Sequence, residues 1–226
     1  MQPIFKVETH LHTSETSACG YLSAREQVTR YHKLGYQAIM VTDHLHASFV
    51  NSVGSEDWST IVDAFLAGYR AAKSVGDELG INVLLGAEIR FAINDSDYLL
   101  YGFDESFLYA NPFLHTLSPQ DFFEKYRDQL LIIHAHPYRN GNEVVFIDCV
   151  HGIETHNANP RHNNYNDKAL LLHQQHPHMP TTSGSDAHRD GDEGRGGLLV
   201  QTPVTTSVEF KKVLFSGNYT HIPLNI

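Results

Sequence analysis

The sequence predicts an α/β fold in one domain spanning residues 1–226, with short strands and amphipathic helices that alternate around a closed barrel. The chain has 226 residues, of which 41% are hydrophobic, and this suits a single domain with a substantial core. Several strand candidates are apolar along their whole length, as expected for strands buried on both faces in parallel β–α–β units. About seven such units fit this length, which favours a closed barrel over an open sheet.

The first half of the chain has clear start and stop signals for helices. Residues 23–35 are predicted to be helical because Ser23 and Glu26 have the spacing of a capping box. Residues 58–80 predict a long helix that ends at Gly80. Strands are predicted at residues 4–9, 37–43 and 81–89, and residues 45–57 are expected to form a mobile loop.

The second half continues the same alternation. A helix over residues 118–128 begins with Ser118 as its cap and Pro119 at its first position. Further helices are predicted at residues 164–176 and 207–215, and strands at residues 97–103, 129–136, 148–157 and 179–188. The glycine-rich residues 190–197 are expected to be mobile.

Composition excludes several classes of protein. The net charge of −10 argues against a broad surface for nucleic acid or membrane, because phosphate groups select faces rich in Lys and Arg. No apolar run approaches the ~20 residues needed to cross a bilayer. The N-terminus has no signal-peptide pattern, and the two cysteines, Cys19 and Cys149, make no disulfide framework. We therefore expect a cytoplasmic protein without a membrane partner, and the oligomeric state is not predicted.

Histidine and carboxylate residues gather where the predicted strands end. In a β/α barrel the carboxyl ends of the strands meet at one mouth, so these side chains are expected to converge. A single such motif is more often a solvated strand end, but together they predict a metal site. The clusters are His10 with His12, Asp43 with His44, Glu88, His134 with His136, Glu154 with His156, and Asp186 with His188.

The residue types indicate which metals would bind. Imidazole and carboxylate ligands without pairs of thiolates suit Zn, Mn or Fe. Residues two apart on a strand point the same way, so His10 and His12 can face one ion, and Asp186 and His188 repeat that geometry. The carboxylate of Glu88 has two oxygens and can bridge two ions.

With these residues assembled, the chain resembles the PHP-domain family, the polymerase and histidinol phosphatase proteins. The resemblance runs from the first strand to the "GSDAH" segment and implies a distorted (β/α)₇ TIM-like barrel with two or three divalent metal ions at its mouth. The matching motifs are the HxH of His10 and His12, the TDH ending at His44, the GxE ending at Glu88, the HP beginning at His136, and the SDAH containing Asp186 and His188.

The resemblance also suggests how the ligands divide among the ions. One ion is expected on His10, His12, Glu88 and Asp186, and a second is shared by Glu88 and His136. The remaining ligands, Glu15, His44 and His188, would hold a third ion or complete the second.

Some positions depart from the family pattern. Where members often carry Asp or His after the HxH, this chain has Ser17 and Ala18, so Glu15 is the nearest carboxylate and Cys19 the nearest soft donor. Asp104 stands about where some members have a further histidine, and His156 is another candidate. The sequence does not decide which of four residues completes the metal shell: Glu15, Cys19, Asp104 or His156.

Together with these residues, the resemblance implies a metal-dependent phosphoesterase, and we expect it to hydrolyse a small phosphomonoester through a metal-activated water. Glu88, Asp186 and His188 are the expected catalytic residues. Arginine matches phosphate oxygens with its planar fork, so Arg139 is the first candidate for binding substrate, followed by Arg161 and Arg189.

Two other functions remain open. The first is a phosphodiesterase or exonuclease acting on nucleic acid or nucleotides, which the acidic charge makes less favourable. The second is a metal-binding regulatory domain without turnover. The sequence fixes neither the substrate nor the identity of the metal.

Overall fold

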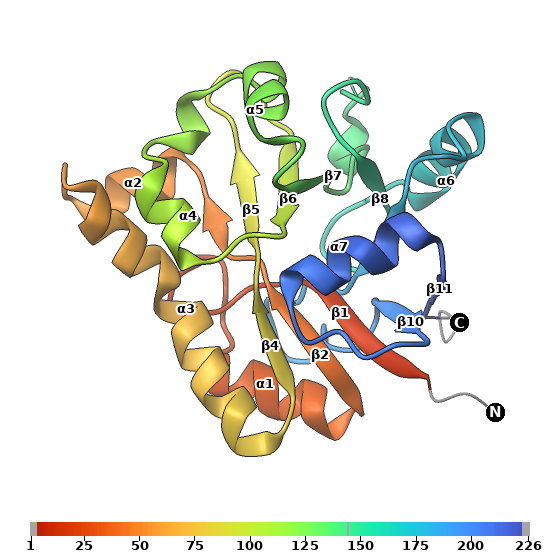
Figure 1. Cartoon of the computed structure of the whole chain (residues 1–226), viewed down its shortest axis with the longest axis horizontal. Helices are drawn as coiled ribbons and strands as arrows, with labels where there is room; N and C mark the ends of the chain where they lie inside the picture. The colour runs from red at the N-terminus through yellow and green to blue at the C-terminus, as the bar shows by residue number, and fades with distance from the viewer. Residues whose placement is uncertain (1–3, 144, 223–226) are drawn as a thin grey trace.

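The computed structural model describes residues 4–143 and 145–222 and shows a mixed α/β fold (Figure 1). In this part of the chain the strands form two sheets. The five-stranded sheet has the order β11-β10-β1-β2-β4, with bounds β1 (Phe5–Leu11), β2 (Tyr36–Val41), β4 (Asn82–Leu85), β10 (Leu198–Val200) and β11 (Tyr219–His221). The six-stranded sheet has the order β3-β5-β6-β7-β8-β9, with bounds β3 (His44–Leu45), β5 (Ala87–Arg90), β6 (Asp97–Tyr101), β7 (Leu131–His134), β8 (Gly152–Asn157) and β9 (Thr181–Gly184).

The helices begin and end largely where the sequence predicts. Ser23 and Glu26 form the capping box, Gly80 ends the long helix in the left-handed conformation, and Ser118 caps a helix with Pro119 in its first turn. Residues 47–53, predicted to be a loop, form a short helix instead. The helices are α1 (Ala24–Lys33), α2 (Ala47–Val53), α3 (Trp58–Leu79), α4 (Glu105–Ala110), α5 (Pro119–Tyr126), α6 (Asn166–Gln175) and α7 (Ser207–Ser216), with 3₁₀ turns at Leu114–Thr116 and Arg139–Gly141. Among the described residues, none of the helices combines the length and the apolarity that a bilayer crossing needs.

The predicted (β/α)₇ barrel is not confirmed, because within the described residues the two sheets do not close into one. The expectation of parallel pairing throughout is wrong for β6, which runs antiparallel to both β5 and β7, and for β10, which runs antiparallel to β1. For β5 and β6 the reason is the length of the connection. Arg90 pairs with Asp97 across β5 and β6, so only residues 91–96 connect them, and a parallel crossover needs about a dozen residues or more.

The apolar core lies on both sides of the sheets. One cluster packs α3, α4 and α5 against the six-stranded sheet, and includes Phe65, Phe91 and Phe122. A second packs α1 and α3 against β2 and β4, around Tyr31 and Ile39. Figure 1 shows α1 and α3 along the outside of β2 and β4, which leaves the ends of the strands free to carry polar side chains.

The two sheets meet where β1 and β9 end. The backbone N–H of Asp186 donates to the carbonyl of His10 at 2.8 Å, and that of His12 donates to the carbonyl of Ala187 at 3.1 Å. Gly184, the last residue of β9, permits this approach, because a Cβ there would lie 2.4 Å from the Cβ of His10. The HxH of the first strand therefore lies directly against the "SDAH" segment.

Candidate metal centre

The strand ends bring most of the predicted ligands into one buried cluster. His10 lies on β1 and His12 directly follows it, Glu88 lies on β5, and His136 and Asp186 follow β7 and β9. His10 is fully buried, and Glu88 and Asp186 are each 1% exposed. Ionisable groups are rarely buried to this extent unless they are paired or coordinate a metal.

One group of atoms within this cluster is arranged like an empty coordination shell. His10 Nε2 and His12 Nε2 lie 3.6 and 3.2 Å from Asp186 Oδ1. Among the described residues, all three atoms are buried and have no hydrogen-bond partner. Because buried polar atoms are nearly always satisfied in folded proteins, three orphaned atoms that converge on one point fit a bound cation.

Glu88 lies at the middle of the cluster and contacts four imidazoles. Its Oε1 is 2.9 Å from His136 Nε2 and 3.4 Å from His10 Nε2, and its Oε2 is 2.9 Å from His44 Nδ1 and 3.4 Å from His12 Nε2. Burial alone would raise the pKa of Glu88. The charges of His10 and His44, with the hydrogen bond from His136, outweigh burial and hold that pKa well below its usual value. Each oxygen thus faces a different set of imidazoles, as a bridging ligand requires.

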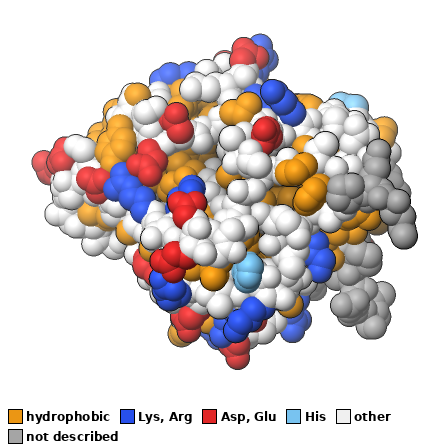
Figure 2. Space-filling view, turned by 60° about the horizontal axis from the view of Figure 1, so that its bottom comes forward, with side chains coloured by type: hydrophobic (Ala, Val, Ile, Leu, Met, Phe, Trp, Pro, Cys, Tyr) orange, Lys and Arg blue, Asp and Glu red, His pale blue; other side chains and the backbone are white. Residues whose placement is uncertain are grey.

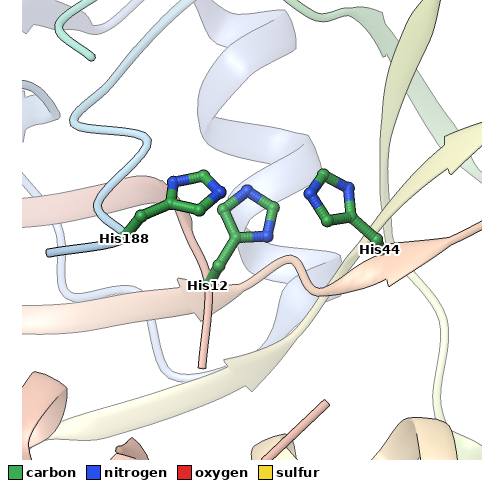
Figure 3. A group of neighbouring side chains, drawn as sticks. All are labelled: His12, His44 and His188. Carbon is green, nitrogen blue, oxygen red and sulfur yellow. The ribbon is translucent and has the colours of Figure 1, made fainter. Parts of the chain in front are cut away.

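Three imidazoles form a second side of the cluster. Figure 3 shows His12 between His44 and His188. The centroid of the His12 ring lies 4.3 Å from the ring centroid of His44 and 4.2 Å from that of His188. Ligand atoms of the three side chains lie within 4.8 Å of one another. Burial, followed by the charges of His188 and His44, holds the pKa of His12 well below its usual value. A neutral His12 is the form that binds metals.

Glu154, which the sequence analysis did not assign to the shell, positions two of the ligands. It is fully buried, its Oε1 lies 3.0 Å from His10 Nδ1, and its Oε2 accepts from the backbone N–H of His136 at 2.9 Å. Burial acts to lower the pKa of His10, but the charges of Glu154, Asp186 and Glu88 raise it well above its usual value. A carboxylate on the far nitrogen of a metal-binding histidine fixes the ring orientation, and the signal for Glu154 was its place at a strand end.

Asp43 supports the loop after β1 rather than facing the cluster. Its carboxylate accepts from Thr13 N–H at 2.8 Å and from the Ser17 hydroxyl at 2.6 Å. Ser17 Oγ in turn accepts from the backbone N–H of His44 at 3.1 Å. Burial raises the pKa of Asp43 to about 6, and the bonds from Ser17 and Thr13 limit that rise.

Three of the open candidates lie outside the cluster. Glu15 accepts from the backbone N–H of Ala24 at 2.9 and 3.0 Å, at the start of α1. Asp104 caps α4 through the N–H of Phe107 at 3.2 Å. His156 Nδ1 accepts from Asn166 Nδ2 at 3.0 Å. The structure therefore does not bring these side chains to the predicted ligands.

Cys19 is the one open candidate that adjoins the cluster. Its thiol lies near the imidazoles of His188 and His44. Burial acts to raise the pKa of the thiol, but its interactions with these two imidazoles lower it to about 6.

Asp97 also adjoins the cluster, and the sequence analysis missed it. It is the first residue of β6, and because β6 is antiparallel to its neighbours, this residue lies at the same edge as the ends of β5 and β7. Asp97 Oδ2 lies 3.8 Å from His136 Nε2. Arg90 holds the carboxylate with two bonds of 2.7 and 2.6 Å.

Of the three predicted substrate-binding arginines, Arg139 reaches the cluster. It forms an ion pair with Asp186 and donates to Asn157 Oδ1 at 3.0 Å and to Asn164 Oδ1 at 2.9 Å. Arg161 is instead paired with Asp192 through bonds of 2.8 and 2.6 Å. The guanidinium of Arg189 stacks 4.5 Å from the ring centre of Tyr21.

A cavity of about 490 Å³ lies beside the cluster and is lined by His136, Asp97, Arg90 and Arg139. A larger cavity, of about 880 Å³, is lined mainly by residues 156–167. The smaller cavity is the one that adjoins the buried ligands, so it is the better candidate for a substrate site.

The chain is similar to known proteins in sequence pattern and in fold. A family model described as "PHP domain" matches residues 8–190. No curated protein matches the sequence. A two-domain protein from Bacteroides vulgatus, containing a predicted PHP-like metal-dependent phosphoesterase, superposes with a TM-score of 0.73 at 17% identity, over 99% of this chain and 66% of that one.

Two further solved structures share the fold. PsfC from Pseudomonas syringae superposes with a TM-score of 0.66 at 16% identity, over 100% of this chain and 93% of that one. An amidohydrolase from Chromobacterium violaceum, with bound sulfate and no metal, superposes with a TM-score of 0.58 at 14% identity, over 95% and 97% of the two chains. At these identities the likeness is one of fold.

Proposed function

This chain belongs to the PHP domain family, and from that premise we propose that it is a metal-dependent phosphoesterase that hydrolyses a small phosphomonoester. The observation that carries the proposal is the set of buried imidazole and carboxylate atoms around Glu88 that lack hydrogen-bond partners among the described residues. His10 Nε2 and His12 Nε2 lie within ion-pair distance of Asp186 Oδ1 but form no hydrogen bond there, and ligands around a metal ion have the same arrangement.

Two or three ions of Zn, Mn or Fe fit this donor set. His10, His12, Asp186 and one oxygen of Glu88 would hold the first. The other oxygen of Glu88, with His136, would hold the second, and Asp97 is near enough to complete that shell. His44 and His188 would hold a third. A divalent ion in such a shell supplies Lewis-acid chemistry to a phosphoester oxygen and to water.

Arg139 is the residue that we propose to bind the substrate phosphate. Asn157 and Asn164 hold its guanidinium in place, and the ion pair with Asp186 keeps it at the edge of the cluster. Arg139 also lines the cavity of about 490 Å³, and so does Arg90. The cavity is small and polar, and Asp95 and Asp97 line it beside the two arginines, so it favours a compact substrate over a long polymer.

The surface supports a small substrate too. On the face drawn in Figure 2, Lys and Arg side chains are interspersed with Asp and Glu, and among the described residues of that face they form no broad basic patch. This mixed surface and the net charge of −10 are both unfavourable for binding a nucleic-acid backbone.

Hydrolysis of a panel of small phosphomonoesters, with Mn, Zn or Fe added and with a chelator as the control, tests this proposal. We expect turnover that depends on the metal and exceeds that of a matched phosphodiester. Faster cleavage of the diester would favour the phosphodiesterase. Bound metal without turnover of either ester, in folded protein, would favour the regulatory domain.

A further inference from the structure

Asn157, the last residue of β8, has its side chain buried between charged groups of opposite sign. The residue is 1% exposed. Its Nδ2 donates to Glu154 Oε2 at 2.9 Å and to Asp186 Oδ2 at 3.2 Å. Its Oδ1 accepts from Arg139 Nη2 at 3.0 Å. One carboxamide therefore connects two carboxylates of the candidate metal centre with the arginine at the substrate cavity.

The charges on its two sides determine how the amide of Asn157 is oriented. An ionised carboxylate can only accept hydrogen bonds and a guanidinium can only donate them. Turning the amide over would place its oxygen against both carboxylates and its NH₂ group against Arg139, and all three bonds would be lost. The backbone N–H of Asn159 also donates to Oδ1, at 3.1 Å, which favours the same orientation.

Two other asparagines hold Asn157 in place from behind. Asn166, at the start of α6, accepts from the backbone N–H of Asn157 at 3.0 Å and donates to its carbonyl at 2.9 Å. Asn164 Nδ2 donates to the carbonyl and to Oδ1 of Asn157, each at 3.1 Å. The side chain of Asn157 cannot shift without breaking bonds to the loop and to the helix that follow β8.

The two carboxylates that Asn157 binds each use their other oxygen at the cluster. Glu154 Oε1 lies 3.0 Å from His10 Nδ1. Asp186 Oδ1 lies 3.6 Å from His10 Nε2 and 3.2 Å from His12 Nε2. By binding Oδ2 of Asp186, Asn157 leaves Oδ1 directed at the two imidazoles.

We propose that Asn157 is a positioning residue that sets the place of Arg139 relative to the metal ligands, so that a phosphate group bound by the guanidinium lies beside Asp186. The inference rests on the proposed function, because it assumes that Arg139 binds the substrate phosphate. An amide is suited to this place because it donates on one side and accepts on the other. A carboxylate there would repel Glu154 and Asp186, and an aliphatic side chain would leave buried charged groups with fewer partners.

A double-mutant cycle with Arg139 tests the proposal. Calorimetry measures the binding of inorganic phosphate to four zinc-loaded proteins: the wild type, Asn157→Leu, Arg139→Ala and the double variant. We expect each single substitution to weaken phosphate binding about 10-fold. The double variant should bind phosphate no more than about 2-fold more weakly than Arg139→Ala, because Asn157 acts through the arginine.

Two serine variants complete the test. Asn157→Ser is too short to reach from Arg139 to the carboxylates, and it keeps the proposal testable if Asn157→Leu does not fold. We expect it to weaken phosphate binding and to raise KM for a phosphomonoester, each about 10-fold, with the metal content at saturating zinc unchanged. Asn163→Ser is the matched control from the same loop. Asn163 is exposed and accepts from the backbone N–H of Tyr165 at 3.3 Å, so this variant should behave like the wild type.

The outcomes separate this inference from the proposed function. Wild-type phosphate affinity in Asn157→Ser overturns the role of Asn157 and leaves the proposed function standing. Single losses that multiply to about 100-fold in the double variant do the same, because they show that the two residues act independently. A zinc-loaded wild type that binds no phosphate and hydrolyses no phosphomonoester overturns both.

Discussion

Glu88 is the residue that the four surrounding imidazoles share, so its charge should decide whether the centre holds metal. Glu88→Gln keeps the volume of the side chain but removes the charge between His10, His44 and His136. We expect the variant to lose at least ~100-fold in metal affinity, with a corresponding loss of phosphoester hydrolysis. Elemental analysis of the folded protein, together with initial rates, measures both effects.

Glu15→Gln is the matched control for that substitution. An amide oxygen can still accept from Ala24 N–H, and the side chain lies away from the cluster, so metal content and rate should equal those of the wild type. Loss of one ion in Glu15→Gln would show instead that this carboxylate moves to the centre when metal binds.

His134 should make the stability of the metal-free protein depend on pH. Burial, followed by the charge of His136, lowers the pKa of His134 to about 3, against an ordinary value of 6.5. The unfolded chain therefore binds more protons between these values. The free energy of unfolding should fall as pH falls through this window, by up to ~1.4 kcal/mol for each pH unit.

Urea unfolding of the wild type and His134→Phe at pH 7 and pH 5 checks this. Phenylalanine can stack on Tyr98, as His134 does with ring centroids 5.0 Å apart, and it carries no proton. The wild type should lose about 2 kcal/mol more than the variant between these two pH values. Equal losses would mean that His134 is protonated in the folded state.

The direction of one strand decides which aspartate lies at the centre. The family resemblance points to Asp104, which follows β6, but this residue caps α4. Since β6 is antiparallel, its first residue, Asp97, lies at that edge instead. Strand direction depends on the length of the connection and on the pairing partner, neither of which periodicity reveals.

Asp97→Asn and Asp104→Asn compare the two positions directly. We expect Asp97→Asn to weaken binding of the second ion about 10-fold, because the substitution removes the negative charge of the carboxylate beside His136. Asparagine caps helices as well as aspartate does, so Asp104→Asn should bind metal like the wild type. The same affinity in both variants would place Asp97 outside the shell and leave it as the partner of Arg90.

For the strands that carry the site, much could be predicted from the sequence. The HxH, TDH, GxE and SDAH motifs mark strand ends, and alternation along a strand puts His10 and His12 on one side. The structure brings these residues together. The choice among Glu15, Cys19, Asp104 and His156 could not be predicted. Cys19 adjoins the cluster because its loop is bound to distant residues, through the bonds of Ser17 to Asp43 and of Tyr21 to His188.

At the scale of the whole molecule, the candidate metal centre lies where the two sheets meet. β1 belongs to the five-stranded sheet, whereas Glu88, His136 and Asp186 are carried by strands of the six-stranded sheet or by the loops that follow them. An ion bound to His10, Glu88 and Asp186 would therefore connect both sheets. The sequence could not show that the site lies between two sheets, because the division of the strands into sheets depends on pairing between distant residues.

Metal should accordingly stabilise the whole fold. At a free concentration 100 times the dissociation constant, one ion adds about 2.7 kcal/mol to the free energy of unfolding. For a chain of 226 residues this raises Tm by about 5–10 °C. Thermal unfolding with zinc and with a chelator measures the difference, and equal Tm values would mean that the ion binds away from the contact between the sheets.

The central claim is that these strand ends form a centre for at least two divalent ions. The most direct test is the metal content of the folded wild-type chain after equilibration with zinc or manganese and removal of free ions, measured beside Glu88→Gln. We predict two or three ions per chain in the wild type and a clear loss in the variant. A folded wild-type chain without bound metal, or one whose metal content Glu88→Gln leaves unchanged, would contradict the claim.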